Sequence, residues 1–307
     1  MAGRPDGPCR DICEPRTCGG RGGFIVADRL AQVSAQIENV RQLQSVVTAM
    51  RGIAASRVQR ARALLAGGDA YSAVVSLAIG QALTLLPADY RAEHGSRRAA
   101  VVLFCAEQGF AGAYSERVLD RGSADLPGAT MFLVGSRGGM AARERGLTAA
   151  WTAPMATHPE AVPALACTIA EALYEYVADG APSRIEVVVP VSGPAGDIRI
   201  ERRSVLPLDL SSFRRPIAQV PPLTTLPPHE LLERLTAEYV YAKLCEATMH
   251  AYAAENQARM MAMTSARNNI EARLTELGQR KLQLRQDEIT SEIVELTAGA
   301  HAMRAMR

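Results

Sequence analysis

The chain has 307 residues, of which 48% are hydrophobic, 21% are charged and only 5% are aromatic. Its formal net charge of +2 excludes a bulk electrostatic attraction to nucleic acid or to an anionic membrane. The sequence has no run of about 18 to 20 consecutive apolar residues, so we expect no membrane-spanning segment. The N-terminus lacks the apolar core of a secretory signal. Few aromatic residues together with much Ala, Leu and Arg favour extended helix pairs over a thick aromatic core.

The first part of the chain, residues 1–26, is rich in Pro, Gly and Arg and is predicted to be a disordered extension. It contains Cys9, Cys13 and Cys18, but a zinc site would need a fourth ligand, and the first histidine of the chain is His94. We therefore predict no metal site here. The three remaining cysteines are expected to be ordinary reduced thiols.

A long helical pattern follows, because no proline occurs between Pro15 and Pro87. Its seam residues are spaced alternately by three and four. They are Leu30, Val33, Ile37, Val40, Gln44, Val47, Arg51, Ala54, Val58, Ala61 and Leu65. A period of 3.5 residues predicts a seam that packs on another helix in a left-handed coiled coil. The pair Gly67-Gly68 predicts a helix end, with a second helix from Asp69 to Leu86, so residues 27–86 are predicted to form N-terminal shaft helices.

The middle of the chain, residues 97–213, has a different pattern. Short apolar runs typical of buried strands occupy residues 97–107, 129–139 and 184–193, and a run with period-two alternation occupies residues 197–208. Helical segments are predicted near residues 114–121, 136–145 and 160–178. Strands that alternate with helices predict an α/β domain with a mostly parallel sheet.

The last segment, residues 229–307, contains no proline and is predicted to be one helix about 110 Å long. A second heptad is formed by Leu282, Ile289, Leu296 and Met303, with Ile293 and Ala300 between them. The predicted fold class is therefore α/β: a long antiparallel coiled coil of the N- and C-terminal helices, with an inserted Rossmann-like α/β domain.

The sequence shows little sign of catalytic chemistry. The segment Gly109–Gly112 follows the first strand and could cradle a phosphate, but it has neither GxxxxGK[ST] nor GxGxxG. A tight turn that needs glycine is the simpler interpretation. No HExxH, no GxSxG and no paired-carboxylate motif is present. We predict no catalytic residues, no cofactor and no metal.

Two blocks near the C-terminus resemble a known family. AENQARMMAMTSARNN (residues 254–269) resembles the E-x-x-A-R-M-x-A-M-x-x-A-x-x-N block of the gamma subunit of F-type ATP synthases. LRQDEITSEIVELTAGAHA (residues 284–302) is similar to that family's closing signature, with Leu296 in place of the usual Ile. TAMRGIAASRV and VVLFCAEQGFAGAY resemble two further blocks, although the family's Asp and Cys in the second are Glu107 and Ala111 here. The resemblance extends from about Ala27 to the C-terminus.

This resemblance implies a non-catalytic rotor subunit, the central stalk of an F-type ATP synthase or ATPase. Such a subunit couples ion flow through the membrane c-ring to ATP synthesis or hydrolysis at a hexamer of alpha and beta subunits by rotating within it. The implied partners are the alpha and beta subunits, the epsilon subunit and the c-ring, with one copy per complex and no nucleic acid. The implied location is the cytoplasmic face of the bacterial inner membrane, as a peripheral membrane protein.

The resemblance also implies roles for individual residues. Those that match family residues hydrogen-bonded to the beta-subunit catch loop are Arg285, Gln286 and Thr290. Those expected on the shaft seam are Met50, Arg259, Ile289, Glu292 and Leu296. Of these, Met50 and Arg259 match family positions where the two helices meet each other and the lower beta-subunit lever.

Three alternatives remain open at this point. RQLQSVVTAMRGIAASR resembles the gamma subunit of the alternate, sodium-type F-ATPases more than the housekeeping form, but ion choice resides in the membrane ring. A nucleotide-binding α/β enzyme with a site at Gly109–Gly112 and a coiled-coil dimerisation arm is the second alternative. The third is a coiled-coil adaptor that forms a homodimer through Leu282, Ile289 and Leu296.

Overall fold

The computed structural model describes residues 21–87, 90, 99–123, 128–178, 184–193, 196–213 and 222–305. Cys9, Cys13 and Cys18 lie outside the described residues. The chain forms two compact units. One consists of residues up to Ser45 and from Asn269 onward, and the other is Val46–Asn268.

Helix α1 (Arg21–Ala82) is a single helix of 62 residues. The predicted break at Gly67-Gly68 is therefore wrong, and the helix begins before the predicted start at residue 27. An interior glycine costs about 1 kcal/mol relative to alanine. Packing on both sides of the pair outweighs this cost, because Ala61 and Ile79 are each fully buried in hydrophobic clusters.

The predicted seam of α1 is confirmed. All eleven positions from Leu30 to Leu65 are buried or half-buried. The same spacing continues through Gly68, Ser72, Val75, Ile79 and Ala82. The heptad thus persists across the glycine pair, as expected for one uninterrupted helix with one inward-facing stripe.

By length and composition alone, α1 also contains a window of mean hydropathy 1.4 that is apolar enough to cross a membrane. The window is not a run of consecutive apolar residues, so the sequence pattern alone does not indicate it. Only 22% of that window is buried within the chain. Part of the apolar surface of α1 is nevertheless buried within the chain, since Val75 and Ile79 lie in one cluster with Leu232 of the last helix.

The second unit contains a five-stranded sheet in the order β3-β2-β1-β4-β5. The strands are β1 (Ala99–Phe104), β2 (Thr130–Val134), β3 (Trp151–Ala153), β4 (Arg184–Ser192) and β5 (Ile198–Leu206). All neighbours are parallel except β4 and β5, which form an antiparallel pair. The mostly parallel sheet is confirmed; β3 was not predicted, because three residues are too few to show a period.

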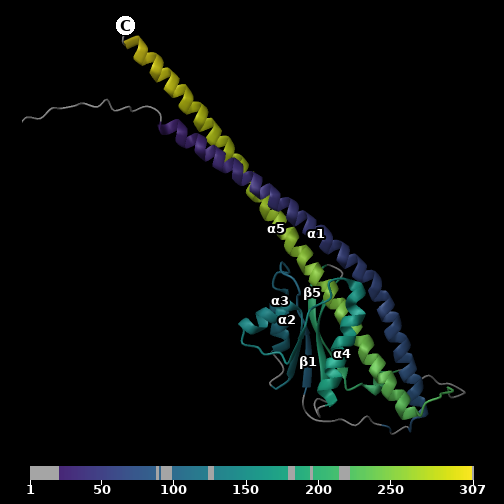
Figure 1. Cartoon of the computed structure of the whole chain (residues 1–307). Helices are drawn as coiled ribbons and strands as arrows, with labels where there is room; N and C mark the ends of the chain where they lie inside the picture. The colour runs from purple at the N-terminus through teal and green to yellow at the C-terminus, as the bar shows by residue number, and fades with distance from the viewer. Residues whose placement is uncertain are drawn as a thin grey trace, which may run out of the picture. The chain divides into compact units, whose positions relative to one another are not determined.

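Helices cover both faces of this sheet (Figure 1). On one face lie α2 (Tyr114–Ser123) and α3 (Ser136–Glu144), which share a cluster with Leu103 and Leu133. On the other face, α4 (Val162–Ala178) shares a cluster with Phe104 and Phe132. Short 3-10 turns occupy Leu83–Leu85, Pro159–Ala161 and Leu210–Ser212.

The last helix, α5 (Pro228–Ala305), has 78 residues and confirms the predicted long C-terminal helix. Within the second unit it packs on α1. Ile79 of α1 shares a cluster with Leu232, whereas Ala61, further back along α1, shares one with Leu244. Later residues of α1 thus pack near earlier residues of α5. The two helices are therefore antiparallel, as predicted.

In the first unit, Val33 of α1 and Leu277 of α5 are 5% and 2% exposed. The half-buried or buried positions of α5 in this unit are Ile270, Leu274, Leu277, Gly278, Lys281, Leu284, Glu288 and Ser291. The predicted C-terminal seam is wrong for packing within this chain, because Leu282 is 66%, Ile289 49% and Leu296 75% exposed. Glu292 is exposed as well. The apolar stripe chosen from the sequence is next to the true seam, displaced by one residue, or about 100° around the helix.

Candidate functional site

The three residues matched to the catch-loop contact, Arg285, Gln286 and Thr290, lie on an exposed part of α5. The Thr290 hydroxyl donates to the Gln286 carbonyl oxygen at 2.8 Å. This bond turns the hydroxyl toward its own helix, while the Arg285 and Gln286 side chains are open to solvent. All three residues lie outside the inward-facing positions of α5, so they are available to a partner chain.

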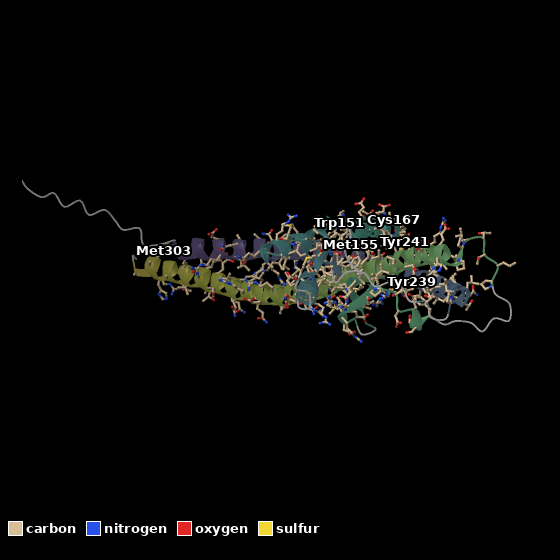
Figure 2. The ribbon with its side chains drawn as sticks, turned by 90° about the horizontal axis from the view of Figure 1, so that it is seen from below. Trp151, Met155, Cys167, Tyr239, Tyr241 and Met303 are labelled. Carbon is tan, nitrogen blue, oxygen red and sulfur yellow. The ribbon has the colours of Figure 1, made fainter. Side chains whose placement is uncertain are left out.

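Beyond Ser291, every described residue of α5 is exposed. We call the apolar residues Ile289, Ile293, Leu296 and Met303 the tip stripe; they are 49%, 56%, 75% and 76% exposed. Their spacing places them on one side of the helix. Met303 lies near the end of α5 (Figure 2). Contiguous exposed apolar side chains on a soluble protein mark an interaction surface.

Helix α1 has a second, outward-facing apolar stripe that the sequence reasoning missed. Leu43, Val46 and Ile53 are 57%, 55% and 56% exposed. Met50, predicted to lie on the seam, is half-buried and has the spacing of this stripe, not of the buried seam. The signal was present in the sequence as a second set of apolar residues one position before the seam.

Arg259 was predicted to lie on the shaft seam, and that role stays a prediction; the contacts of its side chain are with the domain that lies between the two long helices in the sequence. Its side chain is buried against the loop after β1, where the guanidinium donates to the carbonyl oxygens of Gln108 and Gly109, each at 3.2 Å. It also pairs with the Glu255 carboxylate at 2.6 Å. The reason is local: residues 251–259 of α5 are buried around the whole helix, so a charge there needs a partner.

The loop after β1 is the position at which a nucleotide was considered. Phe110 and Gly112 adopt left-handed backbone angles, with φ of 63° and 59°, which explains the glycine at the second position. The cavity beside the loop has a volume of about 160 Å³ and is lined by Gln108, Arg137 and Glu144 among others. This is below the several hundred Å³ of typical small-molecule sites.

The anion-binding groups near this loop are already occupied by a side chain of the protein. The Glu107 carboxylate accepts hydrogen bonds from the backbone nitrogen of Ser136 at 2.9 Å and from that of Met155 at 2.8 Å. It also accepts from the Ser136 hydroxyl at 2.8 Å. Because Ser136 begins α3, a carboxylate here interacts favourably with the helix dipole. A phosphate would have to displace it.

A charged network lies where β5 meets α5. The Glu246 carboxylate accepts from Arg203 at 2.9 Å and from Lys243 at 2.7 Å, and His250 lies 3.9 Å away. Burial acts to raise the pKa of Glu246, but the two cations outweigh it and lower that pKa. Burial and the Arg203 charge lower the pKa of His250. The network is half-buried, and its charged groups are paired with one another.

The cysteines in the described part of the chain are free thiols. Burial raises the pKa of Cys105 to about 12. A hydrogen bond to Glu171 raises the pKa of Cys167, and burial raises that of Cys245. Figure 2 shows Cys167, on α4, together with Tyr241, on α5. Protonated thiols are poor nucleophiles. Among the described residues, no group of three His, Cys, Asp or Glu side chains is arranged to hold a metal.

The chain is similar to known proteins over most of its length. A family model described as ATP synthase matches residues 29–303. The ATP synthase gamma chain of Beutenbergia cavernae is 30% identical, covering 88% of this chain and 96% of the relative. The gamma chain of Clavibacter sepedonicus is 26% identical, covering 91% and 99%.

Among solved structures, a chain of the Euglena gracilis mitochondrial ATP synthase (OSCP/F1/c-ring, rotational state 3) has a TM-score of 0.62 at 14% identity. The match covers 91% of this chain and 96% of that chain, and it shows a shared fold. The family match spans nearly the whole chain and the relatives are covered almost completely. This protein belongs to the ATP synthase gamma chain family.

Proposed function

We propose that this protein is the central-stalk rotor subunit of an F-type ATP synthase or ATPase. The observation that supports this most directly is the end of α5, where an exposed apolar tip stripe and the three matched catch-loop residues belong to one helix. A helix that buried these residues within its own chain would have nothing to present to a surrounding hexamer. Family membership indicates which partners this surface meets.

In this proposal each long helix uses two stripes for two purposes. The inner stripe, such as Val33 on α1 and Leu277 on α5, joins the helices to each other. The outer stripes, including Leu43 on α1 and Leu296 on α5, contact the alpha and beta subunits. Because the two outer stripes differ in residues, each beta subunit meets a different surface. Rotation then changes the contact energy at each catalytic site and shifts its conformational equilibrium.

The chain itself makes and breaks no bonds in this function. Arg285, Gln286 and Thr290 would contact the beta-subunit catch loop, and the α/β domain would contact the epsilon subunit and the c-ring. Gamma chains are a peripheral part of a membrane-bound complex, and we place this one on the cytoplasmic face of the bacterial inner membrane, one copy per complex. The four-part domain division and the alternate, sodium-type subtype stay predictions.

The enzyme alternative has weaker support. A nucleotide at Gly109–Gly112 would have to fit beside a cavity of about 160 Å³, and the nearby donors of Ser136 and Met155 are bound to the Glu107 carboxylate. The α/β fold that such a site uses is present, but the donors at the start of α3 are already bound to a carboxylate of the chain. The rotor function needs no bound ligand in this chain.

Co-expression with the alpha and beta subunits of the same complex tests the proposal. We expect a complex that hydrolyses ATP and contains one copy of this chain. The double variant Arg285→Ala/Thr290→Ala should lower the rate of ATP hydrolysis of the assembled complex, whereas Arg280→Ala, at an exposed position outside the matched set, should not. A chain that never co-purifies with the alpha and beta subunits would refute the rotor assignment.

A further inference from the structure

The ligand crevice of the α/β domain has an identifiable position. In open α/β sheets, ligands bind outside the carboxyl ends of the strands, at the point where the strand order reverses. Here the chain proceeds outward from β1 through β2 to β3 and then returns to β4 on the other side of β1, so the reversal lies between β1 and β4. The loop containing Gln108 and Gly109 borders it on one side, and the β4–β5 turn containing Gly196 on the other.

One turn of α5 reaches both borders. We call residues 255–259 the docking turn. On the β1 side, the Gln108 backbone nitrogen donates to the Glu255 carboxylate at 3.3 Å, and Arg259 donates to the Gln108 and Gly109 carbonyl oxygens. On the β4 side, a methyl group added to Gly196 would lie 3.2 Å from the Gln257 side-chain nitrogen. The docking turn therefore occupies the crevice in which a ligand would bind.

The surrounding contacts permit this close approach. Ala254 and Ala258 of α5 lie in the same cluster as Ala106 and Ala111 of the β1 loop, so only small side chains separate the two backbones. The Tyr114 hydroxyl donates to the Ala251 carbonyl oxygen at 3.1 Å. Glu255 and Arg259 are 3% and 5% exposed, so their charges are compensated by each other and by the loop backbone and not by water.

We propose that the docking turn is a built-in ligand of the α/β domain, and that Glu255 and Arg259 are positioning residues through which this domain and α5 rotate together. The proposal rests on the proposed rotor function. Burial of apolar surface resists separation of the α/β domain from α5, but it does not fix their relative orientation, because the hydrophobic effect is non-directional. Hydrogen bonds have preferred distances and angles, so those of Glu255 and Arg259 to the β1 loop also resist slipping of α5 along and around the loop.

The decisive variant removes the polar contacts without leaving a buried charge unpaired. Glu255→Leu/Arg259→Met replaces both partners by apolar side chains of similar size, a change that proteins often tolerate. The Gln108 and Gly109 carbonyls can then bind water, because neither residue is buried. The matched control is Glu186→Leu/Arg202→Met, which removes the ion pair of the buried Glu186 with the half-buried Arg202, between β4 and β5. Arg184, whose side chain is exposed, also loses its pair with Glu186 in this control.

The first measurement is ATP-driven ion transport per ATP hydrolysed, in membrane vesicles that contain the assembled complex. We expect the docking-turn variant to keep its ATP hydrolysis but to lose most of its transport per ATP, while the control keeps both. Transport per ATP equal to that of the wild type in the docking-turn variant would overturn the proposal.

The second measurement uses the isolated full chain and amide hydrogen exchange. The Gln108 amide should exchange about tenfold faster or more in the docking-turn variant, because it loses a charged acceptor, and should be unchanged in the control. Unchanged exchange in the docking-turn variant would contradict the docking itself. If the wild-type chain does not assemble with alpha and beta subunits, the rotor function fails, and this exchange comparison still decides whether the docking turn holds the loop.

Discussion

Two stretches of α5 have environments opposite to those their side chains would suggest. Residues 251–259 are buried around the whole helix although they include Glu255, Asn256, Gln257 and Arg259. Residues 292–305 are exposed around the whole helix although they include Ile293, Leu296 and Met303. Polar groups are normally outside, and exposed apolar patches need a reason. The first stretch is thus specialised for contacts within the chain, and in the proposed rotor function the second is the one that contacts other chains.

The largest expected effect tests the buried stretch. Arg259→Met alone should destabilise the chain by about 3–5 kcal/mol, because it leaves the buried Glu255 carboxylate without its cation. Arg304→Met, at an exposed position in the last turn of the same helix, is the control and should change stability little. Urea unfolding followed by circular dichroism measures both. Equal urea midpoints for the two variants would mean that the ion pair of Arg259 with Glu255 does not stabilise the fold.

The next effect separates the true seam of the terminal unit from the one predicted from sequence. Leu277→Ala should cost about 2–4 kcal/mol, because this side chain is 2% exposed. Leu282→Ala, which removes the same atoms from a side chain that is 66% exposed, should cost less than about 0.5 kcal/mol. Thermal unfolding of the two variants gives the comparison. If Leu282→Ala lowers the free energy of unfolding more than Leu277→Ala does, the seam predicted from the sequence is the correct one.

The sequence predicted helix packing correctly where one apolar stripe dominates a helix. The α1 heptad predicted every seam residue from Leu30 to Leu65, because its apolar spacing extends over eleven positions with only Gln44 and Arg51 as polar members, whereas the outward stripe is apolar mainly over residues 43–53. On α5 two stripes compete, since the seam includes Lys281, Glu288 and Ser291 while the outward stripe includes Leu282, Ile289 and Leu296. Hydrophobicity alone therefore favours the outward-facing stripe, which does not pack within the chain.

The burial of Arg259 could not be predicted for a related reason. The sequence places it on a helix but gives no sign that the loop after β1 lies against that helix, some 150 residues earlier in the chain. Contacts of this kind depend on where the sheet order reverses, which needs the strand order and not the strand positions. The existence of the strands was predictable; the crevice between them was not.

A smaller effect concerns pH and the half-buried charged network around Glu246 and His250. Burial and Arg203 lower the pKa of His250 in the folded chain, so the unfolded chain binds this proton more readily. Stability should be full above the ordinary histidine pKa near 6.5 and should decline as pH falls below it toward the lowered folded value. Asp69, Glu201 and Glu246 act against this shift. His250→Gln should flatten the decline between about pH 7.5 and 5 in thermal unfolding; an unchanged slope would show that His250 does not cause it.

The smallest effect on the free chain is expected at the tip stripe, and it separates the two stretches of α5 most clearly. Leu296 is 75% exposed, so Leu296→Asp should leave the unfolding midpoint of the isolated chain within about 0.5 kcal/mol of wild type. In a complex with alpha and beta subunits the same carboxylate would be transferred from water to an apolar contact, which is costly without a partner. Assembly or ATP hydrolysis should therefore fall although folding does not. Glu295→Asp, an exposed neighbour with unchanged charge, is the control. If Leu296→Asp unfolds the isolated chain, its side chain supports the fold; if it changes neither stability nor assembly, the tip stripe has no partner.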